Sequence, residues 1–264
     1  MSIPAPHAAF LETALPRLRA DARIVGVAAA GSFARDAMDE HSDLDLVIAV
    51  EDGADDAVMA ERFEIARALA PLLVAFTGEH VGAPRLLICL YGPPLLHVDL
   101  KFVPLADAAK RVDACAVLFD RDGRLARTLA TREPAYPQPD LQWFEDRMWP
   151  WVHYLAGKIA RGELFETIDG LGFIRARVLG PLILAAHGAQ PNGVRRIESA
   201  APDQIAALRE TIPAHDADSC LGALRATIAL YRALRERAAG AGFVHRADAE
   251  RASIDFLAAM ERNR

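Results

Sequence analysis

Three prolines within ten residues interrupt this 264-residue chain, in the segment TREPAYPQPD at residues 131–140. Proline lacks a backbone N–H and fixes φ, so neither a helix nor an inner strand tolerates this density. Strand and helix patterns alternate before the segment, whereas helical periodicity follows it. We therefore predict two domains, at residues 1–131 and 141–264, joined by a linker at residues 132–140.

The first part has the pattern of an α+β domain, in which helices flank a small mixed sheet. Apolar runs predict strands at residues 23–31, 44–50, 84–92 and 95–103, the last two joined as a hairpin by Gly-Pro-Pro. A strand, a turn and a helix are expected within 117–130. Helical periodicity predicts helices at 7–20, with a break or kink near Pro16, at 32–38 and at 55–73. The second part predicts an all-α bundle of about five helices.

Two aspartates, Asp43 and Asp45, stand at the start of the strand expected at residues 44–50. Side chains alternate between the faces of a strand, so both carboxylates point away from the apolar face. Asp99 has the same placement on the strand at 95–103. Like charges this close repel each other unless a cation lies between them, and oxygen ligands suit Mg²⁺ or Mn²⁺. We predict that Asp43, Asp45 and Asp99 hold this metal.

Gly31 and Ser32 precede the aspartates, and Ser32 is the expected N-cap of the helix at 32–38. A helix N-terminus offers free N–H groups and a partial positive charge, which favour phosphate. Gly31 allows the backbone to approach closely, Ser32 adds a hydroxyl donor, and Arg35 is a further candidate contact. Each feature alone can also be a cap, a turn or a surface charge. Together they predict that the metal carries a nucleoside triphosphate.

In this order, the Gly-Ser pair, Asp43-x-Asp45 and Asp99 resemble the signature of the DNA polymerase β-like nucleotidyltransferase superfamily. The stretch GSFARDAMDEHSDLDLVI is similar to the motif of its small bacterial members, and the resemblance covers residues 22–131. The sequence departs from it at Asp36, where many relatives have glycine. The helical part resembles the C-terminal bundle of aminoglycoside nucleotidyltransferases, such as the kanamycin and streptomycin adenylyltransferases.

The resemblance implies a metal-dependent nucleotidyltransferase. It would move a nucleoside monophosphate, AMP from ATP in the expected case, onto a hydroxyl of a small-molecule, antibiotic-like acceptor, with Mg²⁺ or Mn²⁺ as cofactor. The hydroxyl attacks the α-phosphate in line and pyrophosphate leaves.

In the aminoglycoside enzymes a glutamate takes the proton of the acceptor. Glu163 is our first candidate for this base and Glu166 our second, and Lys158 would neutralise the triphosphate. This segment can also be read as a helix end with ordinary surface charges. Asp99 is the alternative base.

Two other functions stay open: a protein- or RNA-modifying adenylyltransferase of toxin–antitoxin type, and a relative that binds nucleotide without catalysis. The helical part favours the small-molecule enzyme, because minimal antitoxin-type members end soon after the core. The sequence pattern does not identify the acceptor, the preferred nucleobase of the triphosphate or the oligomeric state.

The bulk properties limit the partners. The net charge of −6 disfavours bulk nucleic-acid binding, and no apolar run is long enough to predict a membrane span. Three widely spaced cysteines and an N-terminus without a signal-peptide pattern are typical of a cytoplasmic protein.

Overall fold

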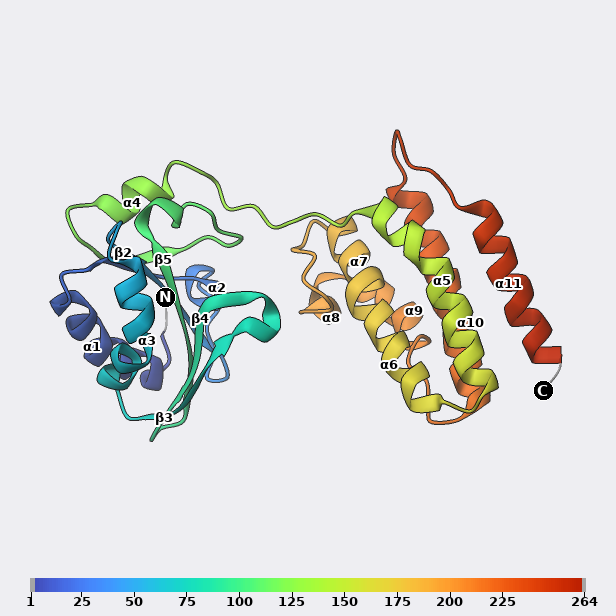
Figure 1. Cartoon of the computed structure of the whole chain (residues 1–264), viewed down its shortest axis with the longest axis horizontal. Helices are drawn as coiled ribbons and strands as arrows, with labels where there is room; N and C mark the ends of the chain where they lie inside the picture. The colour runs from blue at the N-terminus through green and yellow to red at the C-terminus, as the bar shows by residue number, and fades with distance from the viewer. Residues whose placement is uncertain (1–2, 263–264) are drawn as a thin grey trace. The chain divides into compact units, whose positions relative to one another are not determined.

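The computed structural model describes residues 3–262, and the chain divides into two compact units, Met1–Tyr136 and Pro137–Arg264 (Figure 1). The first unit combines a sheet with helices, and the described part of the second is helical. This arrangement confirms the predicted fold class.

A six-stranded sheet in the order β3-β4-β5-β2-β1-β6 forms the centre of the first unit. β2 pairs with β5 in parallel, and the other four pairings are antiparallel, so the sheet is mixed as predicted. The strands are β1 (Ile24–Ala29), β2 (Leu44–Val50), β3 (Leu72–Gly78), β4 (Ala83–Tyr91), β5 (Leu96–Pro104) and β6 (Ala116–Asp120). The helices are α1 (Ala5–Ala20), α2 (Gly31–Ala34), α3 (Asp55–Leu69) and α4 (Arg124–Leu129), with 3-10 turns at Glu79–Val81 and Leu105–Asp107.

The larger core of the first unit lies between one face of the sheet and helices α1 and α3. Every residue of β2 and β5 that the sequence assigns to this face is buried: Leu44, Leu46, Ile48, Val50, Val98, Leu100 and Phe102. On the other face, α4 and the Leu105–Asp107 turn cover a smaller core around Val25, Ala49 and Val103. Asp45 and Asp99 lie on this second face by strand parity, nearer the start of their strands.

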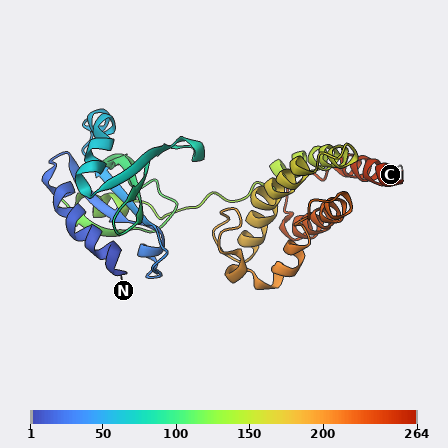
Figure 2. The same ribbon diagram turned by 90° about the horizontal axis from the view of Figure 1, so that it is seen from below.

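The second unit is built on long helices that run side by side (Figures 1 and 2). Its helices are α5 (Leu141–Ala160), α6 (Leu164–Ile174), α7 (Gly180–Ala186), α8 (Ile197–Ala200), α9 (Ile205–Arg209), α10 (Ala217–Ala238) and α11 (Ala247–Arg262). A π-helical turn at Arg175–Leu179 joins α6 to α7, and a 3-10 turn occupies Pro202–Gln204. Trp149 and Tyr231 pack edge to face in the core of this unit and are both fully buried. Across residues 3–262, no helix has the length and the apolar character needed to cross a membrane.

Of the break or kink expected near Pro16, the break is absent, because α1 continues through this proline. Two other local predictions were wrong. The helix expected at 32–38 is only Gly31–Ala34, and its N-cap is Ala30 rather than Ser32. The helix expected at 55–73 ends at Leu69, because a proline at position 71 disfavours helical geometry at the residue before it.

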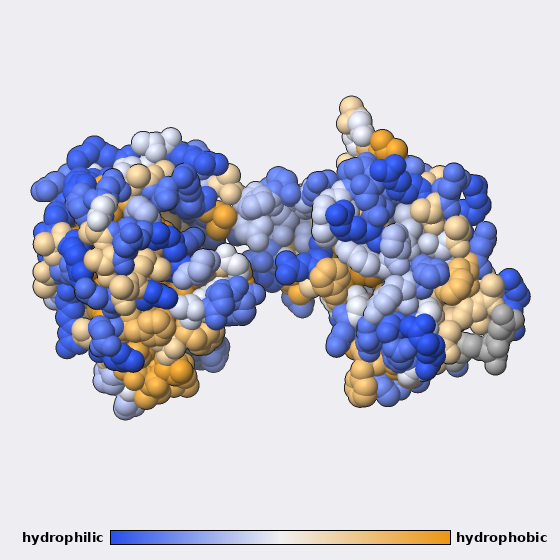
Figure 3. Space-filling model, in the orientation of Figure 1, coloured by the Kyte–Doolittle hydropathy of each residue, from blue (hydrophilic) through white to orange (hydrophobic). Residues whose placement is uncertain are grey.

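The residues after that proline form β3, an edge strand that the sequence reading missed. β3 carries no charged residue and exposes Leu73, Val74 and Phe76 to solvent. Figure 3 shows hydrophobic surface at the end of the first unit where Figure 1 labels β3. A short apolar run beside a helix resembles a continuation of that helix, which explains the error.

Candidate active site

Asp45 and Asp99 are direct partners in the parallel pairing of β2 with β5. Residues in register project to the same face of a sheet, so the two carboxylates stand side by side. Asp43 precedes the first residue of β2 by one position, and its negative charge acts on Asp99. The structure therefore brings the three predicted carboxylates to one end of the same sheet face.

The electrostatics of this group are those of crowded, partly buried carboxylates. Burial raises the pKa of Asp99, the charge of Asp43 raises it further, and His97 acts in the opposite direction. His97 Nε2 lies 2.9 Å from Asp99 Oδ1. His97 precedes Asp99 by two residues on β5, so the two side chains lie on the same face of the sheet.

Gly31 brings the backbone directly against Asp45. Its φ of +60° is in the left-handed region, and a Cβ built on it would overlap Asp45 Oδ2. The neighbouring Ala30 N–H donates to the Asp45 carbonyl at 2.9 Å. Any side chain at position 31 would therefore strain the backbone and displace a predicted metal ligand.

Ser32 is 6% exposed, and its hydroxyl is buried without a hydrogen-bond partner among the described residues. An unpartnered buried hydroxyl is costly, because it has left water without gaining a replacement. A phosphate oxygen would supply the missing partner. Ser32 therefore stays a candidate phosphate contact, although it is not a helix cap.

The loop after α2 begins with Arg35 and Asp36. Arg35 lies 3.6 Å from Asp113 in an ion pair and is more than one third exposed, so its positive charge is already partly compensated. Asp36 has φ +54°. Aspartate tolerates the left-handed region better than most residues, so the backbone at this position does not require glycine.

These residues fit a divalent cation and a phosphate group. The donor set consists of carboxylate oxygens, which Mg²⁺ and Mn²⁺ prefer. Among the described residues, the ligand atoms of Asp43, Asp45 and Asp99 do not all lie within 4.8 Å of one another. Mutual repulsion keeps like charges apart, and a cation between them would compensate that repulsion.

The predicted residues of the second unit gather around Lys158, whose side chain is only 12% exposed. Its Nζ lies 2.5 Å from Glu163 and 3.3 Å from Glu166. Glu163 is the N-cap of α6, and Gly162 before it, with φ +72°, lies between the end of α5 and the start of α6. Lys158, Glu163 and Glu166 therefore form one cluster within the second unit.

The charges in this cluster compensate one another. Lys158 and Arg161 lower the pKa of Glu163, while Tyr154 and Lys158 lower the pKa of Glu166. Glu163 raises the pKa of Lys158 to about 12. A general base works best with a pKa near the operating pH, so ion pairing with two cations makes Glu163 the weaker candidate of the two glutamates.

Comparison with known protein families finds a match within the first unit. Residues 11–77 match a family model described as a nucleotidyltransferase domain. The matched stretch lies within the first unit. It contains Gly31, Ser32, Asp43 and Asp45 and ends before Asp99, so the inclusion of Asp99 in the candidate site depends on the strand register alone. The prediction of a nucleotidyltransferase is confirmed.

Two solved structures are similar to most of the chain at low identity. An aminoglycoside 6-adenyltransferase from Bacillus subtilis is 14% identical, with a TM-score of 0.44, over 98% of this chain and 99% of that one. A nucleotidyltransferase-like protein from Exiguobacterium sibiricum 255-15 is also 14% identical, with a TM-score of 0.40, over 85% of this chain and 74% of that one. A search of curated proteins found no match.

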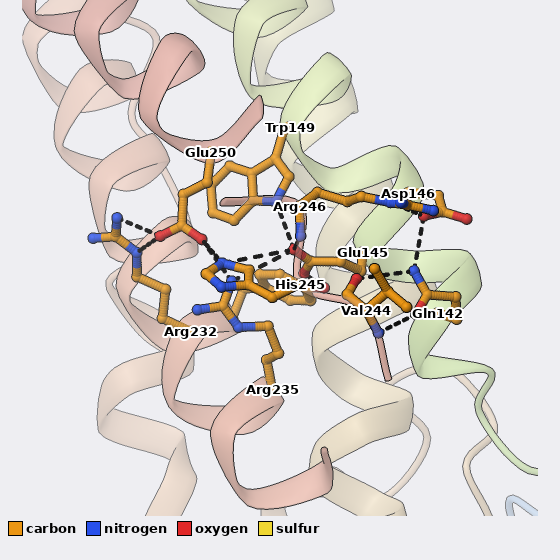
Figure 4. Close-up of polar contacts among 11 residues, drawn as sticks. Gln142, Glu145, Asp146, Trp149, Arg232, Arg235, Val244, His245, Arg246 and Glu250 are labelled. Atoms are coloured by element: carbon orange, nitrogen blue, oxygen red, sulfur yellow. Dashed lines mark hydrogen bonds and ion pairs between the residues drawn. The ribbon is translucent and has the colours of Figure 1, made fainter. Parts of the chain in front are cut away.

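A second group of acidic residues lies within the second unit. Ligand atoms of Glu145, His245 and Glu250 lie within 4.8 Å of one another. Arg232 and Arg235 donate hydrogen bonds to the Glu250 carboxylate at 2.5 and 2.6 Å (Figure 4). The Glu145 carboxylate accepts hydrogen bonds from the Trp149 and Tyr231 side chains and from the Arg246 backbone.

Two guanidinium groups at bonding distance would repel a metal ion from this position. The carboxylates already have partners, so the cluster is an ion-pair network that ties α11 and the segment before it to α5 and α10. It was not predicted from the sequence, because its members are far apart in the chain.

Proposed function

We propose that the first unit transfers a nucleoside monophosphate, AMP from ATP, to a hydroxyl of a small-molecule acceptor. The observation that carries this proposal is the pairing of Asp45 with Asp99 in register, with the Gly31 backbone held against the Asp45 carboxylate. A nucleotide phosphate and a divalent cation are the two groups that this combination fits.

The residues of this chain have distinct parts in the proposed reaction. Asp43, Asp45 and Asp99 hold the metal, and Ser32 donates its hydroxyl hydrogen to a phosphate oxygen. Arg35 is a further phosphate contact once Asp113 releases it. Mg²⁺ held by these carboxylates supplies polarisation of the α-phosphate and a lower pKa of the attacking hydroxyl.

The acceptor oxygen forms a bond to the α-phosphorus, the bond from that phosphorus to the bridging oxygen breaks, and pyrophosphate leaves. A carboxylate takes the proton of the hydroxyl. Glu163 and Glu166 are the proposed bases in the second unit, and Asp99 is the alternative in the first.

A labelling experiment tests the proposal. The full chain is incubated with Mg²⁺, [α-³²P]ATP and a library of hydroxylated small molecules that includes aminoglycosides. Label on a small molecule is the expected result. Asp45→Asn should abolish the labelling, whereas Asp56→Asn, an exposed aspartate of α3, should not change it.

Other outcomes would contradict the small-molecule assignment. Label on the protein or on RNA would support the toxin–antitoxin alternative. Stabilisation by ATP with Mg²⁺ but no labelling across the library would support a non-catalytic nucleotide-binding protein.

A further inference from the structure

His7 occupies a position where the buried face of α1 would ordinarily take an apolar side chain. It lies on the buried side of the helix, one turn before Phe10 and Leu11, and is 1% exposed. Phe10, Leu11, Ala14 and Leu18 continue the same buried stripe into the core under the sheet. A buried polar ring in such a stripe needs a hydrogen-bond partner to offset its loss of water.

The partner of His7 is a backbone carbonyl 35 residues away. His7 Nε2 lies 2.7 Å from the oxygen of Ser42. A carbonyl oxygen only accepts, so Nε2 carries the hydrogen and donates it. His7 Nδ1 is buried with no partner among the described residues, so within them the ring makes its hydrogen bond through Nε2.

The bond holds the residue immediately before Asp43. Asp45 and Asp99 are fixed by the ladder between β2 and β5, whose register begins at Leu44. Asp43 lies outside that ladder. Its position therefore depends on the loop that leads to it, rather than on strand pairing.

The loop at residues 35–43, which leads from α2 to β2, is held by hydrogen bonds at both ends and by further ones within it. The Ala37 N–H donates to the Ser32 carbonyl at 3.0 Å, next to the predicted phosphate contact. The Ser42 hydroxyl donates to the Asp39 carboxylate at 3.0 Å, and the Ser42 N–H donates to the Asp39 carbonyl at 3.2 Å. Of these hydrogen bonds, the one from His7 joins the loop to α1, a helix that packs in the core.

We propose that His7 is a positioning residue: through the Ser42 carbonyl it fixes the approach of Asp43 to the metal site. This inference rests on the proposed function, because the position of Asp43 matters for activity only if Asp43 binds the metal. Residues that orient a metal ligand without touching the metal commonly affect affinity by about 10–100-fold.

Mn²⁺ binding to the full chain, measured by electron paramagnetic resonance with α,β-methylene-ATP, tests the inference. His7→Leu should keep the core filled and the melting temperature equal or higher, while Mn²⁺ affinity falls about tenfold. His7→Gln can place an amide N–H near the position of Nε2 and should restore most of the affinity. His7→Asn has the same amide on a shorter side chain and should not.

Two controls separate the possible failures. Phe10→Leu, one turn along the same buried stripe, should lower the melting temperature and leave Mn²⁺ affinity unchanged. If the wild type does not bind Mn²⁺, or if Asp45→Asn binds it as tightly as the wild type, the proposed function fails. If that binding is present but His7→Leu and His7→Asn match the wild type, or lose affinity only in step with Phe10→Leu, the positioning role is overturned.

Discussion

Gly31 is the residue at which backbone geometry and carboxylate chemistry meet. We expect Gly31→Ala to lower the free energy of unfolding by about 1–3 kcal/mol, because its φ of +60° disfavours a side chain. The new methyl group would also displace Asp45, so Mn²⁺ binding should fall with it. Urea unfolding and Mn²⁺ titration measure the two effects.

Gly82→Ala is the matched control for this prediction. Gly82 has φ +72°, and no neighbouring atom lies within 4 Å of the point that a Cβ would occupy, so it carries the backbone strain without the overlap. It should destabilise the chain and leave Mn²⁺ affinity unchanged. Equal Mn²⁺ affinities in both variants would show that Gly31 is only a structural turn.

The paired carboxylates should matter for activity and not for folding. We expect Asp45→Asn and Asp99→Asn each to reduce turnover by about 10²-fold or more, since each removes charge that stabilises the transition state through the metal. The stability of Asp99→Asn should be unchanged or slightly higher, because this change relieves the repulsion from Asp43 and the burial of a charge. Thermal denaturation beside turnover checks both parts, and a large loss of stability would contradict this account.

At this scale, the sequence was informative where a side chain follows strand parity. Asp45 and Asp99 were placed on one face because alternation along two strands fixes it. The sequence could not show that His7 reaches Ser42, since that contact depends on how α1 packs against the sheet. Ser32 was assigned wrongly as a cap, because only the backbone of α2 shows that Ala30 is the N-cap.

At the scale of elements, the ion-pair network in the second unit should make the packing of α11 depend on pH. Burial alone would raise the pKa of Glu250, but Arg235, His245 and Arg232 outweigh it and lower the pKa from 4.5 to about 2. A carboxylate with a lowered pKa stabilises the folded state above its unfolded pKa. That contribution, at most about 3 kcal/mol, should disappear as the pH falls from about 5 toward 2.

Tryptophan fluorescence can measure this effect in the second unit alone, because all three tryptophans of the chain lie there. Glu250→Gln should lower stability at pH 7 and flatten its dependence on pH below 5. Asp248→Asn breaks an exposed ion pair on the same helix and should do neither. The same slope below pH 5 in Glu250→Gln and the wild type would refute this role for Glu250.

The elements themselves were predictable where periodicity and turn residues agreed. The hairpin of β4 and β5 followed from Gly-Pro-Pro between two apolar runs, and the strand β2 from its alternation. β3 was not predicted, because its apolar run continues the pattern of α3 and its strand character comes from pairing with β4. The π-helical turn after α6 leaves no distinct mark in the sequence.

For the whole molecule, the open question is what the second unit adds to a nucleotidyltransferase domain. The first unit contains the predicted ligands of the metal and the phosphate contact, while the second contains the predicted bases. Removal of a general base typically costs about 10²–10⁴-fold in rate with the substrate still bound. The two glutamates should therefore affect turnover and leave nucleotide binding unchanged.

Glu166 should have the larger effect of the two. Glu163 contacts both Lys158 and Arg161, whereas Lys158 is the cation that contacts Glu166. We expect Glu166→Gln to lower kcat by about 10²-fold or more, and Glu163→Gln to lower it less, with the Kd of Mn²⁺ and α,β-methylene-ATP unchanged in both. Glu236→Gln, on α10 of the same unit, is the control. Wild-type turnover in both variants would leave Asp99 as the base, and a weakened nucleotide affinity would show that the cluster binds the triphosphate instead.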